Sequence, residues 1–150
     1  MTRTRIVFAL CGILGATALF AGPAAAALRF QASLSGTQVV PSKGDPNATA
    51  TVTLTISPSS KLCYVIRPKR LHLLRSAQVH RGAAGTAGST FVTLFSKSKV
   101  ARNGKVTGCA TITARKLEEL AERPNAFYVD VHTKPYPGGA ARGQLTATSS

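Results

Sequence analysis

The residues best suited to chemistry are two histidines, each at the end of a run that alternates apolar and polar side chains. His80 ends residues 76–80, and His132 lies at the end of residues 126–133; a glycine-containing turn or loop follows each run. This pattern is typical of a strand whose last side chain sits at the rim of a sheet. Alternate residues of a strand share a face, so Gln78 and His80 could approach a metal ion together.

The alternative is that these histidines are structural. Glutamine is a poor ligand for a transition metal, and two histidines rarely complete a site. Hydrogen bonds from both imidazoles to the loops that follow them would explain His80 and His132 equally well. We name His80, His132 and Gln78 as candidate ligand or metal residues, leave the metal itself open, and expect no cofactor. The third histidine, His72, falls in a basic segment whose structure the sequence leaves ambiguous.

No group of residues has the pattern of a catalytic site. Nucleophilic hydrolysis needs an activated Ser or Cys with a base and an orienting acid, and the chain has no Gly-x-Ser-x-Gly string. Asp130 stands two residues before His132 and so shares its strand face, where a salt bridge explains it as well as a catalytic pair does. We expect no catalytic residues and a protein that is not an enzyme.

The first residues are typical of a secretory signal peptide. Two arginines precede an apolar stretch at residues 6–20, and an alanine run at residues 24–27 supplies the small residues that signal peptidase requires. The alternative is a membrane anchor, but the stretch is short against the roughly 20 residues that span a bilayer. We predict cleavage after Ala26 or Ala27.

This cleavage would divide the chain into a signal peptide, residues 1–27, and one domain, residues 28–150. A domain of this size can bury an ordinary hydrophobic core. We expect the mature protein to be secreted, periplasmic or at the cell surface, with no membrane span.

The charge is strongly basic. There are 19 Lys and Arg against 5 Asp and Glu, a net charge of +14, and removal of Arg3 and Arg5 with the signal peptide leaves +12. Such a field attracts polyanions, although it also simply keeps a domain soluble. We expect anionic envelope or extracellular polymers, or another secreted protein, as partners. Nucleic acid is not expected, because the chain has few aromatic side chains on which bases could stack.

The positioning elements are predicted to be short antiparallel strands. In residues 48–56 four threonines alternate with apolar residues, which indicates a strand with one face in the core. Similar or β-branched patterns predict strands at residues 28–34, 61–67, 76–80, 90–95, 105–112, 126–133 and 143–147. Leu117, Leu120 and Ala121 share a face of one helix over residues 114–123, which Pro124 ends. The strands indicate an all-β antiparallel sandwich with one short helix in a connection.

Two cysteines, Cys63 and Cys109, remain after the leader, and both lie in predicted strands. In an exported chain they most simply form one disulfide. Two independent buried thiols or a metal pair are the alternatives, although a metal pair normally shows close C-x-x-C spacing, which is absent.

A turn rich in proline and glycine precedes the last predicted strand. Gly138 and Gly139 lie in this turn and Arg142 follows it. The Arg142 guanidinium could reach backbone carbonyls or Asp130 and so pin the turn. We therefore name Gly138, Gly139 and Arg142 as structural residues.

Several uncommon strings occur in a distinctive order along the chain. They are residues 30–36, 62–64, 79–88, 94–95, 108–109, 126–133 and 136–145. Together they resemble the CHRD domain, the repeated module of chordin, which also occurs alone in secreted bacterial proteins. The resemblance implies a Greek-key β-sandwich similar in topology to Cu,Zn superoxide dismutase, and an extracellular location, but no substrate.

The chain departs from this family at two positions. Val39 stands where family members often carry Glu, and Gln78 where they often carry the first His of a His-x-His pair. Both changes remove candidate metal ligands. We expect a secreted, non-catalytic binding or structural module; the alternative is a metal-binding domain with a reduced histidine site on a dismutase-like scaffold.

Overall fold

The computed structural model describes residues 28–71, 73–101 and 103–148. The expected signal peptide and His72 lie outside these ranges. The strands of the described part are β1 (Arg29–Ser35), β2 (Thr49–Ile56), β3 (Lys61–Lys69), β4 (Leu73–Leu74), β5 (Ser76–Arg81), β6 (Thr90–Phe95), β7 (Lys99–Val100), β8 (Val106–Thr111), β9 (Phe127–His132), β10 (Ala141–Gln144) and β11 (Thr146–Thr148). The helices are α1 (Ala114–Glu122) and two single 3-10 turns, η1 (Gly36–Gln38) and η2 (Pro124–Ala126).

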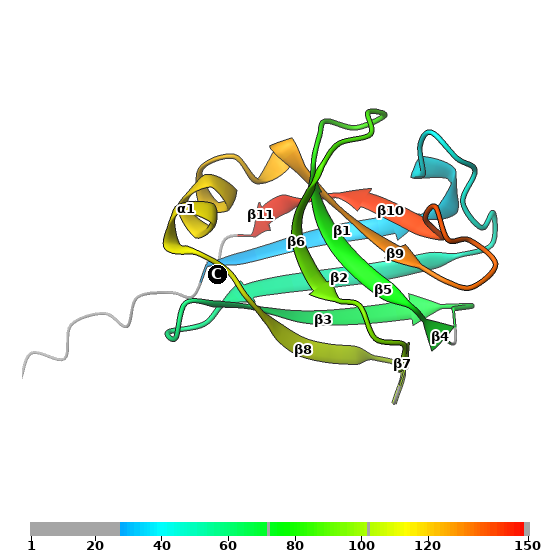
Figure 1. The fold of residues 1–150 in the computed structure, drawn as a ribbon, viewed down its shortest axis with the longest axis horizontal. Helices are drawn as coiled ribbons and strands as arrows, with labels where there is room; N and C mark the ends of the chain where they lie inside the picture. Colours follow the sequence, from blue (N-terminus) through cyan, green and yellow to red (C-terminus); the bar gives the residue numbers. More distant parts are fainter. Residues whose placement is uncertain (1–27, 72, 102, 149–150) are drawn as a thin grey trace, which may run out of the picture.

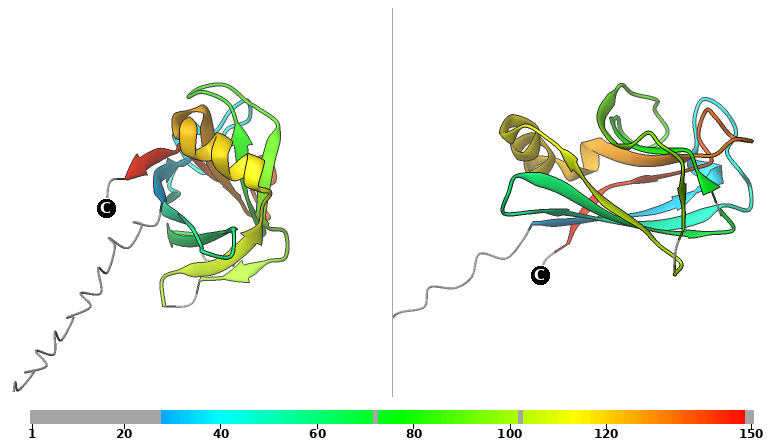
Figure 2. Two further views of the ribbon diagram at one scale, coloured as in Figure 1. Left: turned by 90° about the vertical axis from the view of Figure 1, so that its left-hand side faces the viewer. Right: turned by 60° about the horizontal axis from the view of Figure 1, so that its bottom comes forward.

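Nine of the strands form one antiparallel sheet that folds over on itself (Figure 1). Its order is β6-β5-β9-β10-β1-β2-β3-β8, with β11 also paired to β1. One layer of the resulting sandwich holds β6, β5, β9 and β10, and the other holds β1, β2, β3 and β8 (Figure 2). The expected all-β sandwich is confirmed, and its two layers are joined at one side by the pairing of β1 with β10.

The connections between the layers cross in Greek-key fashion. β5 and β6 form a hairpin in one layer, and the chain then crosses to the other layer, where β8 pairs with β3. After α1 the chain returns and β9 pairs with β5. The chain thus passes from one layer to the other between β6 and β8, and back again between β8 and β9. This crossing brings β5 and β9 side by side although α1, β6 and β8 separate them in sequence.

The core lies between the layers and follows the alternation of the strands. On β2 the apolar Ala50, Val52 and Leu54 are buried, whereas Thr49 and Thr51 are exposed. The two-faced strand expected from the sequence is therefore confirmed. Burying one face of each strand removes apolar surface from water, which is the main source of stability in such a fold.

The helix covers one end of the sandwich (Figures 1 and 2). The Thr113 side chain accepts a hydrogen bond from the Lys116 amide and so caps its first turn. Leu117 and Leu120 are buried, as their spacing predicts, and Pro124 follows directly after the helix. In the described ranges, no helix combines the length and apolar character needed to cross a membrane.

Two details of the strands bear on the sequence expectations. Cys63 and Cys109 lie directly opposite each other on β3 and β8 and form a disulfide, as expected.

The single last strand expected over residues 143–147 is instead divided at Leu145, into β10 and β11. The Leu145 side chain is fully buried and its amide donates to the Phe127 carbonyl, so the strand breaks to turn this residue into the core.

Candidate functional site

The outer face of β9 is polar and yet largely covered. Val129 and Val131 point into the core, so the residues that alternate with them, Tyr128, Asp130 and His132, lie on the opposite face. Asp130 and Tyr128 are buried there. A strand covered on both faces needs a second layer outside the sandwich, and two loops provide it.

Neighbouring strands complete this face. Gln78 on β5 and Arg142 on β10 are the register partners of Asp130 on its two sides. His80 lies one alternation further along β5, opposite Tyr128. The polar residues therefore come from three adjacent strands and centre on Asp130.

The Asp130 carboxylate lies between two imidazoles. Its Oδ1 is 3.1 Å from His132 Nε2 and 3.3 Å from His80 Nε2. The side chains expose only 11% for His80 and Asp130 and 15% for His132. His80 Nε2 also lies 3.1 Å from Gln78 Oε1. We call His80, Asp130, His132 and Gln78 the His–Asp cluster.

The other ring nitrogen of each histidine is held by a loop carbonyl. His80 Nδ1 is 3.1 Å from the Gly88 carbonyl oxygen, and His132 Nδ1 is 2.9 Å from that of Pro137. A carbonyl oxygen only accepts, so each Nδ1 carries the proton and donates. This fixes the orientation of both rings and turns both Nε2 atoms toward Asp130.

The electrostatics of the cluster favour charge on both sides. Burial raises the pKa of Asp130, but hydrogen bonds and attraction from His132 and His80 outweigh it and hold this pKa below its ordinary value. The hydrogen bond to Asp130 raises the pKa of His132 above its ordinary value, against the opposing effect of burial. Asp130 and His132 thus each favour the charged form of the other.

Tyr128 links the cluster to the loop formed by residues 82–89. Its ring stacks on His80 at a centroid separation of 5.0 Å and an interplanar angle of 5°. Its hydroxyl accepts a hydrogen bond from the Gly88 amide. The guanidinium of the buried Arg142 lies over the same ring and donates through Nη2 to the Ala83 carbonyl. The 82–89 loop is thus attached at Ala83 and at Gly88.

The structure brings all three candidate ligands of the sequence analysis together. His80, His132 and Gln78 lie in the His–Asp cluster, and Asp130, which the sequence analysis did not name as a ligand, joins them. The signal for Asp130 was its alternation with His132. Its approach to His80 depends on the pairing of β5 with β9, which no local pattern reveals.

The residues named for the turn occupy the loop formed by residues 133–140. Gly139 has a φ of 124°, a region that favours glycine, and the Gly138 carbonyl accepts a hydrogen bond from the Ser42 hydroxyl. Arg142 directs its hydrogen bond to the 82–89 loop, rather than to this turn or to Asp130.

A second polar surface lies on the outside of the other layer. Ser33, Thr51 and Arg67 are register partners across β1, β2 and β3, and so are Ser35, Thr49 and Lys69. They line an open groove of about 800 Å³. We call the outward side chains of this surface the hydroxyl face: Gln31, Ser33, Ser35, Thr49, Thr51, Thr53, Arg67 and Lys69.

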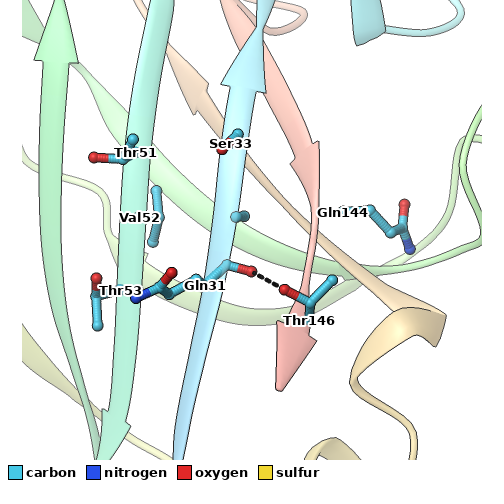
Figure 3. Close-up of a pocket in the computed structure, with 8 residues that line it drawn as sticks. Gln31, Ser33, Thr51, Val52, Thr53, Gln144 and Thr146 are labelled. Carbon is cyan, nitrogen blue, oxygen red and sulfur yellow. Dashed lines mark hydrogen bonds between the residues drawn. The ribbon is translucent and has the colours of Figure 1, made fainter. Parts of the chain in front are cut away.

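This groove continues along the same strands into a second one of about 480 Å³. Figure 3 shows Gln31, Ser33, Thr51 and Thr53 side by side on β1 and β2. Ser33 and Thr51 line both grooves, which therefore form one continuous strip. The Thr146 hydroxyl donates to the Gln31 carbonyl and closes one side of the strip.

Comparison with known proteins identifies one family. The model of the CHRD domain matches residues 30–145, which include both the His–Asp cluster and the hydroxyl face. Neither the curated proteins nor the solved structures contain a match to the chain. The expected likeness to Cu,Zn superoxide dismutase therefore stays a prediction.

Proposed function

The chain belongs to the CHRD domain family, and we propose that it acts outside the cytoplasm as a non-catalytic module that binds an anionic polysaccharide through the hydroxyl face. The observation that carries this proposal is the position of Arg67 and Lys69. These two cations lie on the same face of β3, in a groove that the hydroxyl-bearing Ser33, Ser35, Thr49 and Thr51 also line.

Charge complementarity favours an anionic ligand. The chain carries a net charge of +14. Of its few acids, Asp130 is buried, and Glu119 makes a two-point ion pair with Arg81. Arg67 and Lys69 are exposed, and so are Arg70 and Arg75, which continue the basic segment beyond β3. A surface of this sign raises the local concentration of a polyanion before any specific contact forms.

The hydroxyls suit a sugar chain in particular. Side chains on one face of a sheet repeat about every 6.8 Å along a strand and about every 4.8 Å between strands. Ser and Thr both donate and accept hydrogen bonds, as sugar hydroxyls do. An open strip that spans several strands admits a polymer without the insertion of a chain end into a pocket.

Two observations support a location outside the cytoplasm. Disulfides such as Cys63–Cys109 persist in oxidising compartments and are rare in the cytosol. CHRD domains are typically extracellular. The predicted signal peptide, residues 1–27, agrees with both.

A non-catalytic role agrees with the state of the reactive side chains. Both described cysteines, Cys63 and Cys109, are disulfide-bonded, so neither offers a thiolate nucleophile. The His–Asp cluster is covered by two loops whose carbonyls already occupy one nitrogen of each imidazole.

Binding to immobilised alginate, with neutral dextran as the comparison, tests the proposal. We expect retention on alginate only, weakening steeply with salt, because exposed charges are screened over about 8 Å at physiological ionic strength. The double variant Arg67→Gln/Lys69→Gln should lose about tenfold in affinity, equivalent to about 1.4 kcal/mol.

The matched control removes the same charge elsewhere. Arg115→Gln/Arg123→Gln neutralises two exposed cations on and beside α1, and it should retain most of the affinity. Equal losses in the two double variants would reduce the effect to overall charge and contradict a site on the hydroxyl face. Equal retention on dextran would contradict an anionic ligand.

A further inference from the structure

We propose that the His–Asp cluster binds one divalent transition-metal ion, zinc foremost, through Nε2 of His80, Nε2 of His132 and the carboxylate of Asp130. Their ligand atoms all lie within 4.8 Å of one another. The site shares no residue with the hydroxyl face, so this inference and the proposed function stand or fall separately.

The spacing of the ligand atoms fits a tetrahedral ion. Metal–ligand bonds of about 2.0–2.1 Å at tetrahedral angles place neighbouring ligand atoms about 3.3 Å apart. Asp130 Oδ1 lies 3.3 Å from His80 Nε2 and 3.1 Å from His132 Nε2. Small adjustments of the carboxylate would admit the ion between them, and the fourth position is open to Gln78 Oε1 or to water.

The outer hydrogen bonds are those that a metal site requires. A histidine that binds metal usually donates its other ring N–H to a carbonyl or carboxylate, which fixes the tautomer and the orientation of the ring. The carbonyls of Gly88 and Pro137 do this for His80 and His132. A metal ion bound here would take the place of the protons between Nε2 and Asp130, and each neutral imidazole would then offer its Nε2 lone pair to the ion. Asp130 would add its negative charge to the same ion.

The chemistry and covering of the cluster select the kind of ion. Two imidazoles and one carboxylate favour zinc and its first-row neighbours over magnesium or calcium, which prefer oxygen ligands. The three side chains expose only 11–15% of their surface. Because the ligands are also joined to the 82–89 and 133–140 loops, the ion would hold both loops on the outer face of β5 and β9.

The test is calorimetric titration of the full-length protein, purified without a histidine tag and stripped with EDTA, using zinc chloride and separately magnesium chloride. We expect one equivalent of zinc to bind, no response to magnesium, and a rise in the melting temperature with zinc, because a ligand of the native state stabilises it. Cobalt(II) in place of zinc should give the visible absorption of a four-coordinate ion with nitrogen ligands. No zinc binding to the folded wild-type protein would overturn the proposal and leave a hydrogen-bonded cluster.

The variants locate the ion. Asp130→Asn and His132→Gln should each weaken zinc binding by at least about tenfold, whereas the control Glu122→Gln removes an exposed carboxylate from α1 and should bind as the wild type does. Unchanged binding by folded Asp130→Asn would place the ion elsewhere and also overturn the proposal. The wild-type titration and cobalt spectrum decide the matter even if a variant does not fold.

Discussion

The guanidinium carbon of Arg142 lies 3.4 Å from the centre of the Tyr128 ring. Both residues are buried, on adjacent strands of the outer polar face. Removal from water strengthens a cation–π contact to about 2 kcal/mol, and here the same guanidinium also holds the Ala83 carbonyl.

Arg142→Ala should therefore lower the free energy of unfolding by about 2–4 kcal/mol, because it removes the ring contact and leaves a loop carbonyl without its donor. Urea denaturation measures the change. Arg115→Ala, at an exposed position on α1, should stay within about 0.5 kcal/mol of the wild type. If the two substitutions have the same small effect, Arg142 does not fasten the loop.

Gly88→Ala should loosen the 82–89 loop. A β-carbon at Gly88 would overlap the carbonyl group of Arg81, and the backbone cannot withdraw without breaking the hydrogen bond from the Arg81 amide to Ser89. We expect faster amide exchange throughout this loop and a lower melting temperature.

Gly85→Ala is the matched control for that substitution, since its β-carbon would meet open space. Its φ of 78° still strains an alanine by about 1–2 kcal/mol. The loss of loop protection should therefore be clearly larger in Gly88→Ala than in Gly85→Ala. Equal exchange rates in both variants would contradict a steric cause.

The Cys63–Cys109 disulfide should contribute strongly to stability. It closes a loop with a sequence separation of 46, for which the chain-entropy relation gives about 4 kcal/mol. The double variant Cys63→Ala/Cys109→Ala should lose a large part of this in chemical denaturation. Intact mass without reductant should be two hydrogens below the reduced mass, and two alkylatable thiols in folded, exported protein would count against the bond.

Leu120→Ala should show that α1 is part of the core. Leu120 is fully buried, so truncation leaves a cavity and should cost about 2–5 kcal/mol in the free energy of unfolding. Glu118→Ala, on the exposed side of the same helix, should change little. A small effect at Leu120 would mean that the helix end collapses into the space.

The fold was largely predictable because its signals are local. Alternation along β2 placed Thr51 outside and Val52 inside, and the leucine spacing with Pro124 set the limits of α1 to within one residue. The break at Leu145 was missed because the residues on both sides of it continue an acceptable strand pattern.

The candidate site was predictable only in its parts. Alternation along the sequence predicted that Asp130 and His132 share a face of one strand, and that Gln78 and His80 share a face of a different strand. Only the register that pairs Gln78 with Asp130 unites them. Arg142 shows the same limit: its contact, the Ala83 carbonyl, is 59 residues away in the sequence. Such contacts depend on which strands become neighbours, which side-chain periodicity does not encode.

The two carbonyl contacts of the histidines also set limits on insertion and deletion. Gly88 is eight positions from His80, and Pro137 is five positions from His132. Each loop must leave its strand after the histidine, turn, and bring a backbone carbonyl back to the imidazole of that histidine. Related chains should therefore keep these two intervals constant in length while the residues within them vary. An added residue in either interval should be tolerated far less well than one in an exposed turn whose backbone makes no such hydrogen bond.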